Sequence, residues 1–351
     1  MRGVGARLPM GAPNAEQGIQ APEISPPAGD PLTLRLRAAR NLAVDATATE
    51  VVGRLAEADV PSILLKGRAL NRWLYGDGTP RFYVDCDLLV PPAELPAAEQ
   101  TLRNLAFLPA AGSIPGDRPS HAVTWTRHDG AIVDLHRTIF GPADADQVWE
   151  VLSGQTVPVN LGGSRVESLN PSGLALLVAL HACQHGRTPG KTLEDLERCL
   201  DRAPLAVWTQ AALLADRLQA TPAFSAGLGL LPEGRELVRR LRLPAHDTVE
   251  TALRSSGAPA VAFGLVWLST KPGLRAKALF VARKLVPPPS YMRARYPLAT
   301  DGVAGLATAY GNRAARALRQ APAGLVAWRR ATKQAGSARL LPPRSCARNS
   351  R

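Results

Sequence analysis

Apolar positions in the first part of the chain alternate between spacings typical of helices and of strands. Apolar side chains recur every three to four residues within 32–59, which predicts a helix, and the short apolar segment 62–66 predicts a buried strand. A helix over 68–75, a second strand over 81–90 and a helix over 91–105 follow. This order is typical of a sheet that is flanked by helices.

Two more strands are predicted over 121–127 and 131–139, because the dipeptide Asp129-Gly130 between them favours a hairpin turn. From Asn170, a favourable N-cap that is followed by proline, the pattern is mainly helical to about residue 286. We therefore expect an α/β or α+β domain with a helical domain after it. The expected divisions are a disordered segment over 1–32, an α/β domain over 33–165, a helical domain over 166–286 and a basic, partly disordered segment over 287–351.

Charge is unevenly distributed along the 351 residues. The net charge is +13, but the part from Lys271 onward holds 17 Lys or Arg and a single acid, Asp301. Such a segment could meet nucleic acid, an anionic membrane or an acidic partner protein, and a solvated tail with a bias toward arginine is the alternative.

The remaining composition points to a cytoplasmic protein. Four scattered cysteines without a C-x-x-C pair fit a reducing cytosol rather than a disulfide scaffold or a cysteine zinc site. No apolar segment follows Arg2 and Arg7 as it would in a secretory signal. The longest apolar run, 258–268, is too short to span a bilayer, so we expect no transmembrane segment.

Two aspartates separated by one residue, Asp85 and Asp87, interrupt the apolar strand predicted over 81–90. Side chains alternate along a strand, so both carboxylates should share one face and repel each other. A divalent metal between them would relieve that repulsion. The alternative is a solvated strand end, where two carboxylates cost little.

A third carboxylate, Asp134, lies in the apolar strand predicted over 131–139, and His136 shares its face. An acid among Ile, Val and Leu is unusual unless it meets a partner. If the strands are neighbours, Asp85, Asp87 and Asp134 form a cluster of oxygen ligands that suits one or two Mg²⁺ ions. Such a cluster indicates phosphoryl or nucleotidyl transfer.

Several basic groups accompany the acidic cluster. Lys66 and Gly67 precede the helix over 68–75, where backbone N–H groups could approach a phosphate. Arg81 could neutralise a phosphate or form a structural salt bridge, and His136 could contact the substrate or be a satisfied structural histidine. His181 and His185, four residues apart, are expected on a helix face that packs toward the cleft. In the same region Thr192 to Asp195 resembles a capping box.

The chain resembles the uncharacterised nucleotidyltransferase family, a branch of the DNA polymerase β-type nucleotidyltransferase superfamily. The resemblance rests on Leu64-Leu-Lys-Gly67, Leu74-Tyr75, Arg81 with Asp85-Cys-Asp-Leu-Leu-Val90, and Val133-Asp-Leu-His136. Residues 176–200 and 289–296 are also similar, so the resemblance covers roughly 45–310. It implies a small mixed sheet flanked by helices, followed by a mainly helical domain.

The resemblance implies that Asp85, Asp87 and Asp134 bind Mg²⁺, and that Asp134 also helps to activate an acceptor hydroxyl. NTP would be the substrate. The usual glycine-serine signature of the superfamily is replaced by Lys66-Gly67-Arg68, so Lys66 or Arg68 is expected to supply the missing phosphate contact.

Three functions are compatible with these residues. The chain could be a Mg²⁺-dependent nucleotidyltransferase that acts on a hydroxyl of a small molecule, peptide, protein or RNA. It could instead be a catalytically inactive binding protein on the same fold, or a nucleotidyltransferase toxin that modifies RNA. The basic C-terminal segment would serve a nucleic acid or an acidic partner.

Overall fold

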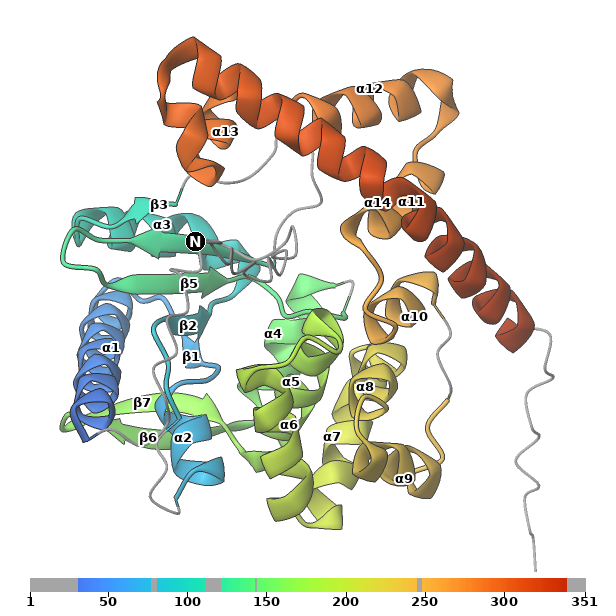
Figure 1. The fold of residues 1–351 in the computed structure, drawn as a ribbon. Helices are drawn as coiled ribbons and strands as arrows, with labels where there is room; N and C mark the ends of the chain where they lie inside the picture. The colour runs from blue at the N-terminus through green and yellow to red at the C-terminus, as the bar shows by residue number, and fades with distance from the viewer. Residues whose placement is uncertain (1–30, 77–80, 111–120, 143, 245–247, 340–351) are drawn as a thin grey trace, which may run out of the picture.

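A mixed sheet of seven strands is the framework of the protein (Figure 1). The structure is a computed structural model that describes residues 31–76, 81–110, 121–142, 144–244 and 248–339. The strands follow the order β3-β4-β5-β2-β1-β7-β6 across the sheet. Their bounds are β1 Ile63–Leu64, β2 Cys86–Leu89, β3 Leu108–Pro109, β4 Ala122–Thr126, β5 Ile132–His136, β6 Thr156–Leu161 and β7 Ser164–Leu169.

The register between β2 and β5 decides which polar groups meet. The two strands are parallel, and Asp87 is paired directly with Asp134 while Leu89 is paired with His136. Paired residues of neighbouring strands project from the same face of a sheet, and so do residues two apart on one strand. This register brings together Asp87 and Asp134, two of the three carboxylates expected to form one cluster, and it places His136 beside them.

Helices from the first half of the chain cover the sheet. They are α1 Pro31–Glu57, α2 Arg68–Leu74, the 3₁₀-helix η1 Pro92–Glu94, α3 Leu95–Asn104 and α4 Ala145–Ser153. Helix α1 packs against α3 and contacts β2, β6 and β7. The mixed sheet flanked by helices, expected from the resemblance, is thus confirmed.

The helical half is built around α5 Pro171–His185. Ten residues of α5 are buried, and it contacts β7 and four other helices, α6, α7, α8 and α10. A helix that is apolar all round has to be enclosed in this way. The predicted start is confirmed, because the Asn170 side chain accepts a hydrogen bond from the Gly173 N–H at 2.9 Å. The surrounding helices are α6 Lys191–Arg202, α7 Leu205–Arg217, α8 Thr221–Leu228, α9 Pro232–Arg240 and α10 Val249–Ser255.

A third layer lies above the sheet and the α5 bundle in Figure 1. It consists of α11 Ala260–Ser269, α12 Gly273–Leu285, α13 Pro289–Arg295, the 3₁₀-helix η2 Pro297–Thr300 and the 38-residue α14 Gly302–Arg339. Helix α14 contacts α10, α11, α12, α13 and η2, so it joins the layer together. None of the described helices is both long enough and apolar enough to cross a membrane.

Some expectations need revision or fall outside the described residues. The β6–β7 hairpin was not predicted, and the domain boundary expected at residue 165 falls inside β7. The capping box at Thr192–Asp195 is wrong: α6 begins at Lys191 behind Gly190, which makes no side-chain cap. The disorder expected over 1–32 concerns residues outside the described ranges, apart from the start of α1 at Pro31.

Candidate active site

Asp87 on β2 and Asp134 and His136 on β5 form a compact group of polar side chains. Each offers a ligand atom, and these atoms all lie within 4.8 Å of one another. Asp87 and His136 are both 5% exposed. The Asp134 carboxylate interacts with the Thr124 hydroxyl on β4, yet its Oδ1 is buried without a hydrogen-bond partner among the described residues. A buried carboxylate oxygen of this kind requires a ligand or a proton.

Lys66 and His136 converge on one oxygen of Asp87. The Lys66 Nζ lies 3.1 Å from Asp87 Oδ1, and the His136 Nε2 lies 3.0 Å from the same atom. Burial alone would raise the pKa of Asp87, but the Lys66 ammonium and the His136 imidazole hold it well below its usual range. Burial would likewise lower the pKa of Lys66, and the charges of Asp87 and Asp85 raise it instead. The Lys66–Asp87 pair is therefore ionised at neutral pH.

Asp134 differs from Asp87 in the direction of its pKa shift. Burial, and then the negative charge of Asp87, raise the pKa of Asp134 above its ordinary value. The two carboxylates thus have pKa values that are displaced in opposite directions. In such a pair, the carboxylate with the lowered pKa stays charged and the one with the raised pKa can accept a proton.

Asp85 lies immediately before β2, which begins at Cys86, and is therefore not part of the strand. It does not belong to the group of atoms within 4.8 Å of one another. Its charge nevertheless reaches the site, because it contributes to the raised pKa of both Lys66 and Asp134. Its role as a metal ligand stays a prediction.

The turn between β1 and α2 places Lys66 at the acidic group. Gly67 has φ 64°, a left-handed conformation that glycine adopts without strain, and it precedes α2 without a side-chain cap. The first N–H groups of α2 are thus left without a capping side chain. Arg68 points elsewhere: its Nη1 lies 3.8 Å from Asp45 on α1, and its side chain is 46% exposed. The phosphate role expected of Arg68 stays a prediction.

Arg81 is held by an acid from the helical half. Its Nε and Nη2 donate to the two oxygens of Asp195 on α6 at 2.9 and 2.8 Å, and the Tyr75 hydroxyl donates to Asp195 Oδ1 at 2.7 Å. All three side chains are buried. The structure thus shows the salt bridge that was one of the two alternatives for Arg81, and a phosphate role stays a prediction.

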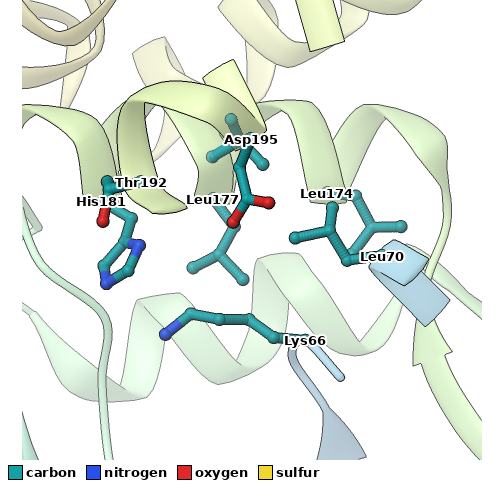
Figure 2. A pocket seen from close by; sticks show the side chains of 8 residues that line it. Lys66, Leu70, Leu174, Leu177, His181, Thr192 and Asp195 are labelled. Carbon is teal, nitrogen blue, oxygen red and sulfur yellow. The ribbon is translucent and has the colours of Figure 1, made fainter. Parts of the chain in front are cut away.

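A small pocket lies between α2, α5 and α6, beside the acidic group. Figure 2 shows the Lys66 ammonium and the His181 imidazole at one end, and leucine side chains toward the other. Its lining comes from both halves of the chain: Lys66, Leu70, Leu174, Leu177, Val178, His181, Thr192 and Asp195. The expectation that the His181 face of α5 packs toward a cleft is confirmed.

The histidines near the pocket are held neutral. Burial, followed by the charges of His136 and Lys66, lowers the pKa of His121 to about 3, and burial with Lys66 lowers that of His185 to about 4. Burial also lowers the pKa of His181, whose ring centroid lies 4.5 Å from that of His185. Neutral imidazoles can both donate and accept hydrogen bonds, so they suit an uncharged polar group of a ligand.

Two residues at the site had no recognisable signal in the sequence. His121 lies directly before β4, its ring centroid 5.5 Å from that of His136, and Gln184 Nε2 lies 3.5 Å from its Nε2. Lys191 opens α6, and burial together with the nearby charge of Arg81 lowers its pKa. The pairing of β4 with β5 brings His121 to His136, and the packing of α6 brings Lys191 to this region.

Comparison with known proteins adds a family and a set of distant structural likenesses. Residues 31–233 match the family model described as an uncharacterised nucleotidyltransferase. No curated protein matches the chain in sequence.

The structural likenesses are to proteins of low sequence identity. The crystal structure of ANT(2")-Ia in complex with adenylyl-2"-tobramycin is 14% identical, with a TM-score of 0.37 over 49% of this chain and 97% of that one. The lincomycin-bound lincosamide antibiotic adenylyltransferase LnuA is 13% identical, with a TM-score of 0.31 over 43% and 92%. An antigenic nucleotidyltransferase-like protein from Paracoccidioides brasiliensis is 17% identical, with a TM-score of 0.33 over 52% and 94%. Likeness at this level carries no conclusion about substrate.

Proposed function

The chain belongs to the uncharacterised nucleotidyltransferase family, and from that premise we propose that it transfers a nucleoside monophosphate from an NTP to a hydroxyl group of an acceptor, with Mg²⁺. The observation that carries the proposal is the group formed by Asp87, Asp134 and His136, with a buried and unpartnered oxygen on Asp134. This oxygen lies where a polyvalent cation or a reacting proton would be accommodated.

The donor set fits a divalent cation. Asp87 and Asp134 present carboxylate oxygens, which Mg²⁺ prefers, and Asp85 lies directly before the same strand. We assign Asp87, Asp134 and Asp85 to one or two Mg²⁺ ions, and His136 to the orientation of Asp87 through its 3.0 Å contact. When bound, the metal supplies positive charge to the phosphates of the donor and to the departing pyrophosphate.

Asp134 is the residue best suited to take the proton of the acceptor hydroxyl. Its pKa is raised by burial and by Asp87, and its Oδ1 has no hydrogen-bond partner among the described groups. A base whose pKa lies closer to the working pH transfers protons more efficiently. In the proposed step the acceptor oxygen bonds to the α-phosphorus, the bond to pyrophosphate breaks, and the hydroxyl proton passes to Asp134.

Positive groups beside the acidic cluster are assigned to the triphosphate. Lys66 reaches the cluster from the glycine turn before α2, and Lys191 opens α6 on the other side of the pocket. We assign to these two lysines the phosphate contact that the missing serine of the superfamily signature would otherwise make. A point charge binds a phosphate well, and a lysine performs this task in other phosphate sites.

The decisive experiment uses ATP labelled on either the α- or the γ-phosphate, with Mg²⁺ and a cell extract as the source of acceptor. Nucleotidyl transfer labels the acceptor only from the α-position. Asp134→Asn keeps the side-chain shape but removes the proton acceptor and one metal ligand. It should therefore lower transfer by at least about a hundredfold, the scale of general-base catalysis.

Asp216→Asn, an exposed carboxylate on α7, is the matched control and should transfer label at the wild-type rate. Equal transfer by wild type and Asp134→Asn would refute the proposed site. Transfer from the γ-position would refute the reaction itself. The same assay identifies the acceptor as the molecule that becomes labelled. Labelled RNA would favour the RNA-modifying toxin, and the absence of any labelled acceptor would favour the inactive binding protein.

A further inference from the structure

Helix α12, Gly273–Leu285, has no buried residue although it contains Leu, Phe and Val side chains. Its main contacts among the described elements are with α11 and α14, and Figure 1 shows it at the upper edge of the molecule. Most helices of a globular protein bury their apolar stripe against the core. The apolar positions of α12 are instead presented to solvent.

Three of those positions form one stripe, whereas Leu279, 50% exposed, lies about 140° from Leu274 around the helix. Leu274, Val281 and Leu285 are 86%, 39% and 46% exposed. At about 100° per residue they lie within roughly 40° of one another around the helix axis. Ala278, also exposed, continues the same line, so the outward face of α12 is apolar along its whole length.

Basic side chains flank this stripe on both sides, and no acid accompanies them. Arg275 is exposed on one side, and Lys277 and Lys284 are half-buried on the other, whereas Arg283 is exposed on the face opposite the stripe. The Lys284 ammonium lies 4.9 Å from the centre of the Trp267 ring. An apolar strip between rows of Lys and Arg is the arrangement of a helix that lies in a membrane interface.

Other occupants fit less well. Nucleic acid would use the basic groups but would leave an 86% exposed leucine without a partner. A second copy would bring two strongly basic layers together. A protein partner needs about 800 Å² of complementary surface, more than the outward stripe of a 13-residue helix offers. A lipid surface requires neither shape complementarity nor a large footprint.

We propose that α12 binds the surface of an anionic lipid bilayer, with Leu274, Val281 and Leu285 in the boundary between headgroups and acyl chains. The basic residues at the sides of the stripe would lie at the level of the lipid phosphates. The third layer would then hold the enzyme at a membrane without crossing it. This inference does not depend on the proposed reaction.

Flotation of the full chain with phosphatidylcholine vesicles, with and without phosphatidylglycerol, tests the proposal. Wild type should float with the anionic vesicles, and high salt should weaken this binding. Leu274→Ser/Leu285→Ser should lower partitioning by about a hundredfold, since each leucine contributes roughly a factor of ten or more. Arg275→Gln should lower it by about fivefold, the effect of one charge near the lipid surface.

Matched controls separate this surface from general effects. Leu42→Ser/Leu213→Ser removes two exposed leucines from α1 and α7, and Arg217→Gln/Arg240→Gln removes two exposed arginines from α7 and α9. Both should partition as wild type does. Equal partitioning of wild type into the two kinds of vesicle, or unchanged partitioning of Leu274→Ser/Leu285→Ser, would overturn the proposal. Binding of a labelled single-stranded RNA, weakened only by the α12 arginine variant, with no vesicle binding, would assign the surface to nucleic acid.

Discussion

The buried ion pair between Arg81 and Asp195 should be one of the most sensitive points of the fold. The two residues are 3% and 2% exposed. Arg81 Nε bonds both carboxylate oxygens at 2.9 and 3.1 Å, its Nη2 bonds Oδ2 at 2.8 Å, and the Tyr75 hydroxyl adds a fourth bond at 2.7 Å. Replacing Asp195 with Asn removes the negative charge and keeps the shape of the side chain.

The expected loss of stability follows from the charge that the substitution leaves unpaired. Removing one partner of a buried pair leaves the other charge without compensation, which costs about 3–5 kcal/mol. Arg81 is only 3% exposed, too little for water to replace the carboxylate, so we expect the cost of Asp195→Asn to lie within this range. Tyr75→Phe removes a single hydrogen bond to a charged group and should cost about 1.5–3 kcal/mol.

Urea unfolding of single and double variants measures these values. Arg81→Met and Asp195→Leu should each cost about 4 kcal/mol. The double variant should cost about 4 kcal/mol or less instead of about 8, because it leaves no unpaired charge. The coupling energy in the cycle would then be on the order of 4 kcal/mol. Glu233→Gln, an exposed carboxylate on α9, should change stability by less than about 0.5 kcal/mol.

The reasoning would be refuted if the stability losses of Arg81→Met and Asp195→Leu simply added in the double variant. A loss of less than about 1 kcal/mol for Asp195→Asn would also refute it. The same variants also discriminate between the two roles of Arg81. If Arg81 contacts a phosphate, Arg81→Met/Asp195→Leu should bind NTP more weakly although it remains folded. If the salt bridge is its role, the affinity of this double variant for NTP should stay within about threefold of wild type.

Three further predictions follow from the structure. Gly227→Ala should cost at least about 3 kcal/mol of stability, because the new Cβ would overlap the Ala179 carbonyl of α5. The Cβ of Gly264→Ala would have no neighbouring atom within 4 Å, so that variant should stabilise the protein by up to about 1 kcal/mol. Thermal unfolding measures both changes. The folded pKa of His185 is about 4, below that of an exposed histidine, so stability should fall by roughly 3 kcal/mol as the pH drops from about 6.5 to 4, and His185→Gln should flatten this part of the profile in urea titrations. Lys66→Met should bind Mn²⁺ about tenfold more tightly, because the ammonium group that competes for Asp87 is gone, and it should bind NTP about tenfold more weakly. Calorimetric titration measures both affinities. A change of both affinities in the same direction would contradict this prediction.

The core of the site could be predicted from local patterns. Period-two alternation places Asp134 and His136 on one face, and the apolar neighbours of Asp87 and Asp134 identify both strands as buried. A single assumption, that the two strands are neighbours, then brings Asp87 to Asp134. The parallel register confirms this assumption, so two of the three predicted metal ligands lie together, while Asp85 lies just outside β2.

Other features depend on contacts that no local pattern reveals. The four residues from Thr192 to Asp195 have capping-box spacing, but Asp195 lies a full turn inside α6 and binds Arg81, which is 114 residues away in the chain. A buried arginine close by is a stronger partner for the carboxylate than the solvent-accessible N–H groups of a helix end. The β6–β7 hairpin did have a local signal, the Gly162-Gly163 turn with φ of 55° and 94° between its strands, and this signal was overlooked.

The helical half is therefore part of the candidate active site and not an independent attachment to the sheet. Asp195 fixes the segment that leads into β2, since Arg81 lies six residues before Asp87, and His181 and Thr192 line the pocket in which Lys66 ends. If α5 and α6 moved away from the sheet, Arg81 would lose its partner and the pocket would lose six of the eight residues that line it. Asp195→Asn, which leaves Arg81 without a compensating charge, unlike the apolar double variant, should consequently raise the KM for NTP before it unfolds the sheet. An increase in KM at urea concentrations where the sheet is still intact would separate this coupling from global unfolding.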